Sequence, residues 1–254
     1  MNELLKSRSD RPWEGGDSVV SRVVLEQSER CLQSYEANPT LIEEHANIER
    51  STTQGGYGHR QLYELVQNGA DELQKEPGGG IQIVLTEEAL YCANLGTPVS
   101  PEGVETILAS HVSRKRCTEI GRFGLGFKSV LSVSDRPAFF SRSGSFGWDA
   151  TATREAIRAR VASDTPTPVL RVAHLLDSAK EKANDPVLGE LMDWATTVIR
   201  LPLLEGAVRR LARDIKELPA KFALFSPHVE QVVLEDRRNP ARVYRREIRV
   251  RGEG

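Results

Sequence analysis

Apolar residues along the chain follow a helical spacing in some segments and a strand-like spacing in others. Three helices are expected near the start, over residues 18–38, 41–50 and 59–75, where apolar side chains recur every three to four positions. The segment 51–58 between the last two is polar and rich in glycine, which predicts a loop. A run of proline and glycine after Glu76 ends the third helix.

Short apolar runs rich in β-branched and aromatic residues predict strands further along the chain. The expected strands are residues 81–85, 89–93, 138–141, 145–149, 197–201, 229–234 and 243–250. Three later helices are expected: residues 101–110, residues 204–218, and a helix that begins within 121–129 and ends at 133. Residues 151–195 show no clear periodicity. Because strands and helices alternate without a regular βαβ rhythm, the predicted fold class is α+β. We expect a two-layer α/β sandwich in which helices cover one face of a mixed, mostly antiparallel sheet.

The length and charge of the chain indicate one globular domain. We place this domain at residues 18–236 of the 254, after a flexible segment at 1–17 and before an arginine-rich strand or junction at 237–254. Lys and Arg number 34 and Asp and Glu number 36, so the formal net charge is −2. This balance argues against nucleic acid as a general partner, since phosphate contacts require a basic excess.

Cysteine usage and hydropathy exclude several other classes of protein. The three cysteines lie far apart, which argues against both a disulfide framework and a zinc site. No apolar run has the length of a bilayer span, and the first residues form no apolar leader. We therefore expect a cytoplasmic protein without a membrane partner.

One face of the helix predicted at residues 59–75 carries polar side chains that suit catalysis or metal binding. At about 100° per residue, Glu64, Asn68 and Asp71 fall on one face, and apolar residues fall on the other. The apolar half can pack on a sheet and leave two carboxylates and an amide aligned. An ordinary solvent-facing helix has the same pattern, so the helix alone leaves both interpretations open.

Two further segments offer groups that bind ligands. Gly121, Gly124 and Gly126 allow backbone N–H groups to approach an anion, with a spacing that differs from the P-loop and from the dinucleotide fingerprint. Asn94 ends a predicted strand, where its amide can contact the edge of a ligand. A glycine-rich turn without a ligand and a simple exit from a strand are the alternatives.

Three segments together resemble motifs of a known superfamily. Residues 64–71 (ELVQNGAD), 94–98 (NLGTP) and 121–129 (GRFGLGFKS) resemble, in this order, three motifs of the GHKL ATPases, which include gyrase, heat-shock chaperone, histidine kinase and MutL. The sacsin-like branch is the most similar, with further likeness in residues 43–47 and 55–58. Thr197 resembles the late strand threonine that supports adenine in these proteins.

The resemblance implies a domain that binds ATP and Mg²⁺. It implies Asn68 as the Mg²⁺ ligand and Glu64 as the general base that activates water. The ATP-binding residues that it implies are Asn68, Asp71, Asn94, Gly96, Gly121, Phe123, Gly124, Leu125, Gly126, Phe127, Lys128 and Thr197. Residues 114–116 lie in what resembles the family's mobile lid, although a solvated run of charges is the favoured interpretation of these residues. The resemblance further implies that lid closure regulates an unknown protein partner or client, as in chaperones. A homodimer is left open.

Three functions stay open after these observations. The first is an ATPase with slow hydrolysis; because chaperone-type relatives complete their site with a basic residue from a following domain, ATP binding is the primary expectation and turnover the secondary one. The second is a nucleotide-sensing scaffold without hydrolysis. The third is nucleic-acid binding through residues 237–254, although arginines there also suit an edge strand protected by charge. The family's second motif usually carries Asp where this chain has Asn94, which leaves the choice of base open.

Overall fold

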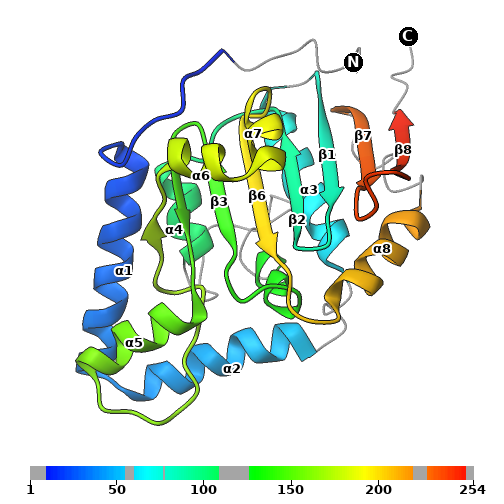
Figure 1. Cartoon of the computed structure of the whole chain (residues 1–254). Helices are drawn as coiled ribbons and strands as arrows, with labels where there is room; N and C mark the ends of the chain where they lie inside the picture. Colours follow the sequence, from blue (N-terminus) through cyan, green and yellow to red (C-terminus); the bar gives the residue numbers. More distant parts are fainter. Residues whose placement is uncertain (1–9, 55–59, 77, 109–125, 220–227, 250–254) are drawn as a thin grey trace.

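The chain is built on one eight-stranded sheet with helices on its faces (Figure 1). The computed structural model describes residues 10–54, 60–76, 78–108, 126–219 and 228–249. The strands are β1 (Gly79–Leu85), β2 (Ala89–Asn94), β3 (Ala138–Ser141), β4 (Gly144–Gly147), β5 (His174–Leu175), β6 (Thr197–Pro202), β7 (Val229–Asp236) and β8 (Tyr244–Arg249). Their order across the sheet is β5-β4-β3-β6-β2-β1-β7-β8. In the described ranges all neighbouring strands are antiparallel except β1 and β7, which confirms the predicted mixed sheet.

Most of the helical mass lies against one face of this sheet. The helices are α1 (Val19–Ala37), α2 (Thr40–Gln54), α3 (Gln61–Lys75), α4 (Pro101–Leu108), the 3-10 helix η3 (Phe127–Ser132), α5 (Ala150–Arg160), α6 (Ser178–Asn184), α7 (Pro186–Met192) and α8 (Ala207–Glu217). Helix α1 contacts β4 and β5, α3 contacts β1 and β2, and α8 contacts β1 and β7. The predicted α+β class is therefore confirmed. None of the described helices combines the length and apolar character that crossing a bilayer requires.

Helix α3 holds its place through the apolar stripe that its sequence predicts. Leu62, Leu65, Val66 and Leu73 are buried against the sheet. Burying such side chains contributes roughly 1.5–3 kcal/mol each, which fixes the rotation of the helix about its axis. Because the leucine side chains of α3 face the sheet, the polar face of the helix lies at the edge of the contact between α3 and the sheet.

Helices α6 and α7 pack on the opposite face, in front of the central strands in Figure 1. Tyr91 of β2 donates a hydrogen bond of 2.9 Å from its hydroxyl to the Asp185 carboxylate. The Arg200 guanidinium of β6 contacts Asp185 at 3.3 Å and Glu181 at 2.6 Å. The Cζ atom of the Arg200 guanidinium also lies over the Phe140 ring, 5.3 Å from the ring centroid. The second face of the sheet is thus covered by two short helices in addition to the main helical layer.

Capping carboxylates start the helices in the segment that the apolar pattern leaves unassigned. Asp149, Asp177 and Asp185 each accept hydrogen bonds from backbone N–H groups at the start of α5, α6 and α7. Such caps stabilise a helix by about 1 kcal/mol each. These helices are short, and α6 has no buried residue, so the segment 151–195 has little apolar periodicity to detect.

The predicted loop at 51–58 is wrong in its first part, because α2 continues to Gln54. Hydroxyl groups there bond to the backbone of the preceding turn: Ser51 and Thr52 both donate to the Ile48 carbonyl at 2.9 Å. Thr52 is also buried. Polar residues that favour loops are therefore accommodated in a helix by bonding backward to it. Residues 55–58 lie outside the described residues.

The N-terminal segment predicted to be flexible is attached to the domain in its described part. Trp13 donates from its ring N–H to the Met192 carbonyl at 3.2 Å, and the Arg142 guanidinium lies 5.1 Å from its ring centroid. Glu14 donates its backbone N–H to the Arg142 carbonyl at 2.9 Å. A single tryptophan in a polar segment is enough to anchor it, because one large ring buries much apolar area.

The arginine-rich tail forms an edge strand with paired charges. Strand β8 lies at the end of the sheet order, next to β7. Arg237 pairs with Glu190 at 2.6 Å, Arg245 with Glu235 at 3.4 Å, and Arg238 with Asp236 at 2.8 Å. Much of the tail's positive charge is thus matched within the fold. This arrangement favours the interpretation as an edge strand protected by charge.

Glu49 connects α2 to the loop before β5. Its carboxylate is buried and accepts hydrogen bonds from the backbone N–H groups of Val169 (2.7 Å) and Leu170 (2.9 Å). Burial raises the pKa of this carboxyl, while the two N–H donors and Lys128 oppose that rise. Truncating the side chain leaves two buried donors without their acceptor and removes a negative charge that acts on Lys128.

We expect Glu49→Ala to lower the free energy of unfolding by about 3–5 kcal/mol, as for other buried charges that lose a partner. Urea denaturation followed by circular dichroism measures this change. Glu44→Ala on the exposed face of the same helix is the matched control, with an expected change within about 0.5 kcal/mol. Equal stabilities of the two variants would contradict this role of Glu49.

Candidate functional site

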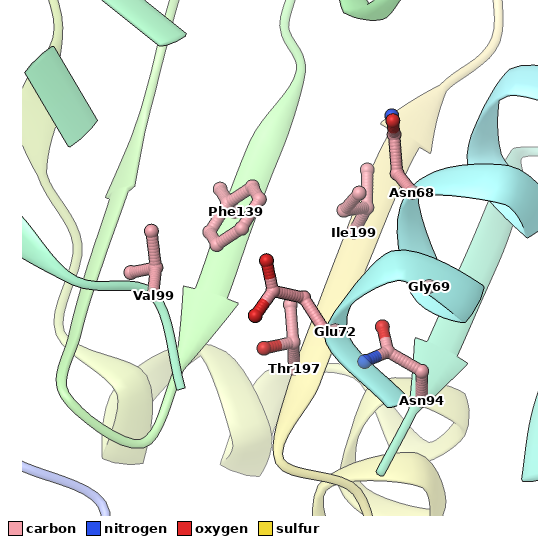
Figure 2. A pocket seen from close by; sticks show the side chains of 8 residues that line it. All are labelled: Asn68, Gly69, Glu72, Asn94, Val99, Phe139, Thr197 and Ile199. Carbon is pink, nitrogen blue, oxygen red and sulfur yellow. The ribbon is translucent and has the colours of Figure 1, made fainter. Parts of the chain in front are cut away.

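A small pocket of about 20 Å³ lies between α3 and the sheet (Figure 2). This volume has room for about one water molecule and is far below the range for small-molecule sites. Helix α3 contributes one wall, and β2, β3 and β6 with the segment after β2 contribute the others. The lining residues are Asn68, Gly69, Glu72, Asn94, Val99, Phe139, Thr197 and Ile199. Of the residues predicted from the three motifs and the late strand, Asn68, Asn94 and Thr197 meet here.

Close approach of α3 to the sheet depends on Gly69. A Cβ at this position would lie 3.1 Å from Ile81 and 3.4 Å from Asn94. A side chain would therefore push the helix away from β1 and β2. A glycine inside a strongly helical pattern is the sequence signal for such a close contact between helix and sheet. Gly69 is not among the site residues predicted from the sequence.

Asn94 and Thr197 are direct neighbours across two strands. They are paired residues in the antiparallel ladder of β2 and β6. The Asn94 side chain is buried, and its Nδ2 donates to the Leu95 carbonyl at 2.6 Å. No donor from the described residues reaches Oδ1, so the carbonyl oxygen of the amide is the group left to meet a ligand.

The side-chain amide of Asn68 is buried, and its Nδ2 lacks a partner in the described part of the chain. The residue is 4% exposed, and no described residue forms a hydrogen bond with Nδ2. An unsatisfied amide group in a protein interior costs roughly 1–3 kcal/mol. Such a group is rare in folded proteins and calls for an explanation, of which an absent ligand is one.

Glu64 lies one helical turn before Asn68, in the first turn of α3. The side chain is half-buried, and burial raises the pKa of its carboxyl, opposed by the nearby Arg60 charge. A Cβ at position 126 would collide with Glu64 Oε2, so Gly126 gives the carboxylate room beside the backbone. The structure therefore brings Glu64 together with the end of the third motif.

Lys128 and Phe127 do not line the pocket. Lys128 is 2% exposed, and burial lowers the pKa of its ammonium to about 8, against the opposing effect of Glu49. Phe127 packs in an aromatic cluster, with ring centroids 5.5 Å from Trp148 and 6.4 Å from Phe139. Phe127 belongs to the hydrophobic core, and Lys128 is buried close enough to Glu49 for the two charges to interact. The predicted residues Gly121, Phe123, Gly124 and Leu125 lie outside the described residues, as do residues 114–116.

Asp71 is not among the lining residues, and Glu72 is. On the helical wheel, Glu72 falls near 80° when Glu64 is at zero, beside Asn68 near 40°. The pocket therefore lies on the side of the polar stripe away from Asp71. A wheel shows which residues share a face, but which part of that face meets the sheet is decided by packing.

Gly96 supports the site through its backbone. Its φ is +103°, and a Cβ there would lie 2.8 Å from both the carbonyl carbon and the carbonyl oxygen of Glu72. The residue holds the turn after β2 against α3 instead of facing the pocket. Its role in the structure is thus to position Glu72.

We expect Gly96→Ala to destabilise the fold by about 3 kcal/mol or more, because left-handed strain and a backbone collision add. Gly206→Ala separates the two effects, since Gly206 has φ +81° but no atom within 4 Å of a Cβ. The control should lose only about 1–2 kcal/mol. Thermal unfolding of both variants measures the difference, and a smaller loss for Gly96→Ala than for Gly206→Ala would contradict the packing argument.

No protein-family model matches this chain, and no curated protein matches its sequence. The resemblance to GHKL ATPases therefore stays a prediction. The described residues also contain no group of three or more His, Cys, Asp or Glu side chains suited to hold a metal ion.

Proposed function

We propose that this chain is a Mg²⁺-dependent ATP-binding domain that hydrolyses ATP slowly. One observation carries the proposal: polar side chains from three separate segments, Asn68, Asn94 and Thr197, converge on a single pocket whose walls are otherwise largely apolar. A concave apolar pocket with a few convergent polar groups is typical of small-molecule sites. In the same proposal, the nucleotide state governs contacts with a protein partner.

The base would enter between α3 and the strands, which requires the walls of the small pocket to move apart. Phe139, Ile199 and Val99 offer apolar surface on which a flat ring can pack. Asn94 Oδ1 would be the acceptor for an amino group, because Nδ2 of the same amide already donates to the Leu95 carbonyl. The amide that replaces the family's usual Asp therefore still presents an acceptor.

The phosphates and the metal would lie toward the start of α3. Mg²⁺ is bound by oxygen atoms, and it is commonly held by one or two protein groups together with phosphate oxygens and waters. The buried, unpartnered amide of Asn68 fits this demand, since its Oδ1 can coordinate while Nδ2 donates to a phosphate oxygen. When bound, Mg²⁺ supplies positive charge that offsets the charge of the phosphates.

Glu64 is the residue that would activate water. It lies one turn from Asn68, and burial raises the pKa of its carboxyl. A base whose pKa lies nearer the working pH accepts a proton more readily, provided that it is still ionised. The half-buried position of Glu64 thus suits proton transfer from a water to the carboxylate.

Isothermal titration calorimetry with ATP, in the presence and absence of Mg²⁺, tests the proposal. We expect saturable binding that Mg²⁺ strengthens, and phosphate release above that of a Glu64→Ala variant. Binding without phosphate release would favour the nucleotide-sensing scaffold over the ATPase. A native protein that fails to bind ATP at millimolar concentration with Mg²⁺ would overturn the proposal.

A further inference from the structure

A second pocket, of about 550 Å³, lies where helix α8 meets the turn between β7 and β8. This volume falls within the range of small-molecule sites, unlike that of the pocket between α3 and the sheet. Figure 1 shows α8 beside the strands β7 and β8. The lining residues, none of which lines the first pocket, are Glu87, Lys216, Asp236, Arg238, Asn239, Arg242, Val243 and Tyr244.

The turn that forms one wall of this second pocket is held by Asn239. The Asn239 carbonyl accepts a hydrogen bond from the backbone N–H of Arg242 at 2.9 Å, and its Oδ1 accepts one from the Ala241 N–H at 3.0 Å. Asparagine commonly stabilises turns by such local hydrogen bonds. Asp236 and Tyr244 are paired residues at the end of the ladder between β7 and β8. The backbone at Arg242 therefore has a defined position at the pocket.

One of the three cations in the lining is already matched by carboxylates of the protein. Arg238 donates from Nε to Asp236 Oδ1 and from Nη2 to Asp236 Oδ2, both at 2.8 Å. These hydrogen bonds raise the pKa of the Arg238 guanidinium, and the charge of Glu87 in the turn between β1 and β2 adds to the rise. Arg238 and Asp236 thus form a neutral unit in the wall of the pocket.

The other two cations, Lys216 and Arg242, have no carboxylate of their own. Among the residues that the structure describes, neither side chain forms an ion pair. Lys216 Nζ lies over the Tyr244 ring, 5.8 Å from the centroid, and this contact orients the ammonium beside the pocket. Two unmatched cations face one remaining carboxylate in the lining, that of Glu87, so the pocket has an excess of positive charge.

Apolar surface lies beside these two cations. Val243 is 47% exposed and is one of the few large apolar side chains exposed on the described part of the molecule. The Tyr244 ring is partly buried and packs against the hydrophobic core, which gives it a fixed place in the wall. A ligand with an anionic head and an apolar body complements this combination of charge and surface.

We propose that this second pocket binds a small organic anion, namely a phosphate or carboxylate attached to an apolar group. Lys216 and Arg242 hold the anionic head, because ammonium and guanidinium groups donate charge-assisted hydrogen bonds to such oxygen atoms. Val243 and Tyr244 contact the apolar body. Glu87 opposes binding through its negative charge. The site is separate from the proposed ATP site and does not depend on it.

Phenyl phosphate is the probe, and NMR titration of the ¹⁵N-labelled native protein measures both its affinity and its location. We expect saturable shifts in the amide signals of residues 236–244. Inorganic phosphate lacks the apolar body and should bind at least about fivefold more weakly. Benzylamine carries a similar ring with the opposite charge and should cause no saturable shift at these residues. Benzoate distinguishes the two heads, and its binding at the same residues would equally support the proposal.

Three variants test the charges of the pocket, each against a matched control. Lys216→Gln and Arg242→Gln should each weaken binding of phenyl phosphate by at least about fivefold, because each removes a charged donor. Arg213→Gln makes a similar change at an exposed residue of α8 outside the pocket and should keep the native affinity. Glu87→Gln should strengthen binding about twofold, because it removes the opposing charge at an exposed site. A gain in affinity cannot result from loss of the fold.

Several results would overturn the proposal. One is the absence of saturable shifts at residues 236–244, or shifts confined to α3. Another is equal binding of phenyl phosphate and benzylamine. A third is native affinity in both Lys216→Gln and Arg242→Gln when circular dichroism shows both variants folded. None of these results bears on ATP binding at Asn68, because the two pockets share no residue.

Discussion

Asn68→Ala is expected to weaken binding of Mg²⁺-ATP by at least about a hundredfold. The amide is the one protein ligand proposed for the metal, and outer partners of metal sites alone contribute 10–100-fold to affinity. Its Nδ2 is also a donor that no described residue satisfies, so a phosphate oxygen would be its first partner. Calorimetric titration with ATP and Mg²⁺ measures the loss.

The stability of this variant should move in the opposite direction to its affinity. Removing an unpaired buried amide relieves its desolvation cost, so Asn68→Ala is expected to unfold at the same temperature as the native protein or higher. Asn47→Ala on the exposed face of α2 is the matched control and should bind ATP normally. Unchanged ATP affinity in Asn68→Ala would show that this residue has no part in the site.

The periodicity of apolar residues was enough to predict the sheet and its principal helices. Helix α3 has a clear stripe of leucine and valine, and the strands β1 and β2 are short apolar runs closed by a turn. Strand β5 and the short helices between residues 150 and 192 were missed, although α7 buries three apolar side chains. Helices α5, α6 and α7 begin at capping carboxylates, and the end of α2 is held by hydroxyls that bond back to Ile48.

The sequence indicated which residues lie together where their position follows from the backbone alone, and their role in binding stays a prediction. Asn94 ends one strand and Thr197 begins its neighbour, so the ladder places them opposite each other. The sequence did not indicate that Glu72 lines the pocket or that Lys128 is buried outside it, because packing directs these side chains. The helical wheel cannot say which part of a polar face meets the sheet, and a lysine next to glycines gives no sign that a buried Glu49 attracts it.

Glu64→Gln is expected to retain ATP binding and to lose hydrolysis. Glutamine keeps the shape of the side chain beside Gly126 but cannot accept a proton from water, and general-base catalysis contributes about 10²–10⁴-fold to a rate. Affinity for ATP should stay within about threefold of the native value, because the proposed metal ligand is Asn68. Phosphate release under saturating ATP measures the rate. Glu43→Gln, in the first turn of α2 and exposed, is the matched control and should hydrolyse ATP at the native rate.

The pH dependence of the native rate distinguishes a Glu64 that acts as a general base from a Glu64 that only supports the structure. Only the ionised carboxylate can act as a base, so the rate should rise with pH through the pKa of Glu64. Burial raises that pKa above the ordinary value of a glutamate, which places the acid limb of the profile at a higher pH than an exposed carboxylate would give. This limb should be absent from whatever slow phosphate release remains in Glu64→Gln. If Glu64→Gln keeps both the native rate and the native acid limb, Glu64 is not the general base. The proposed binding of ATP at Asn68 would not be affected by that result.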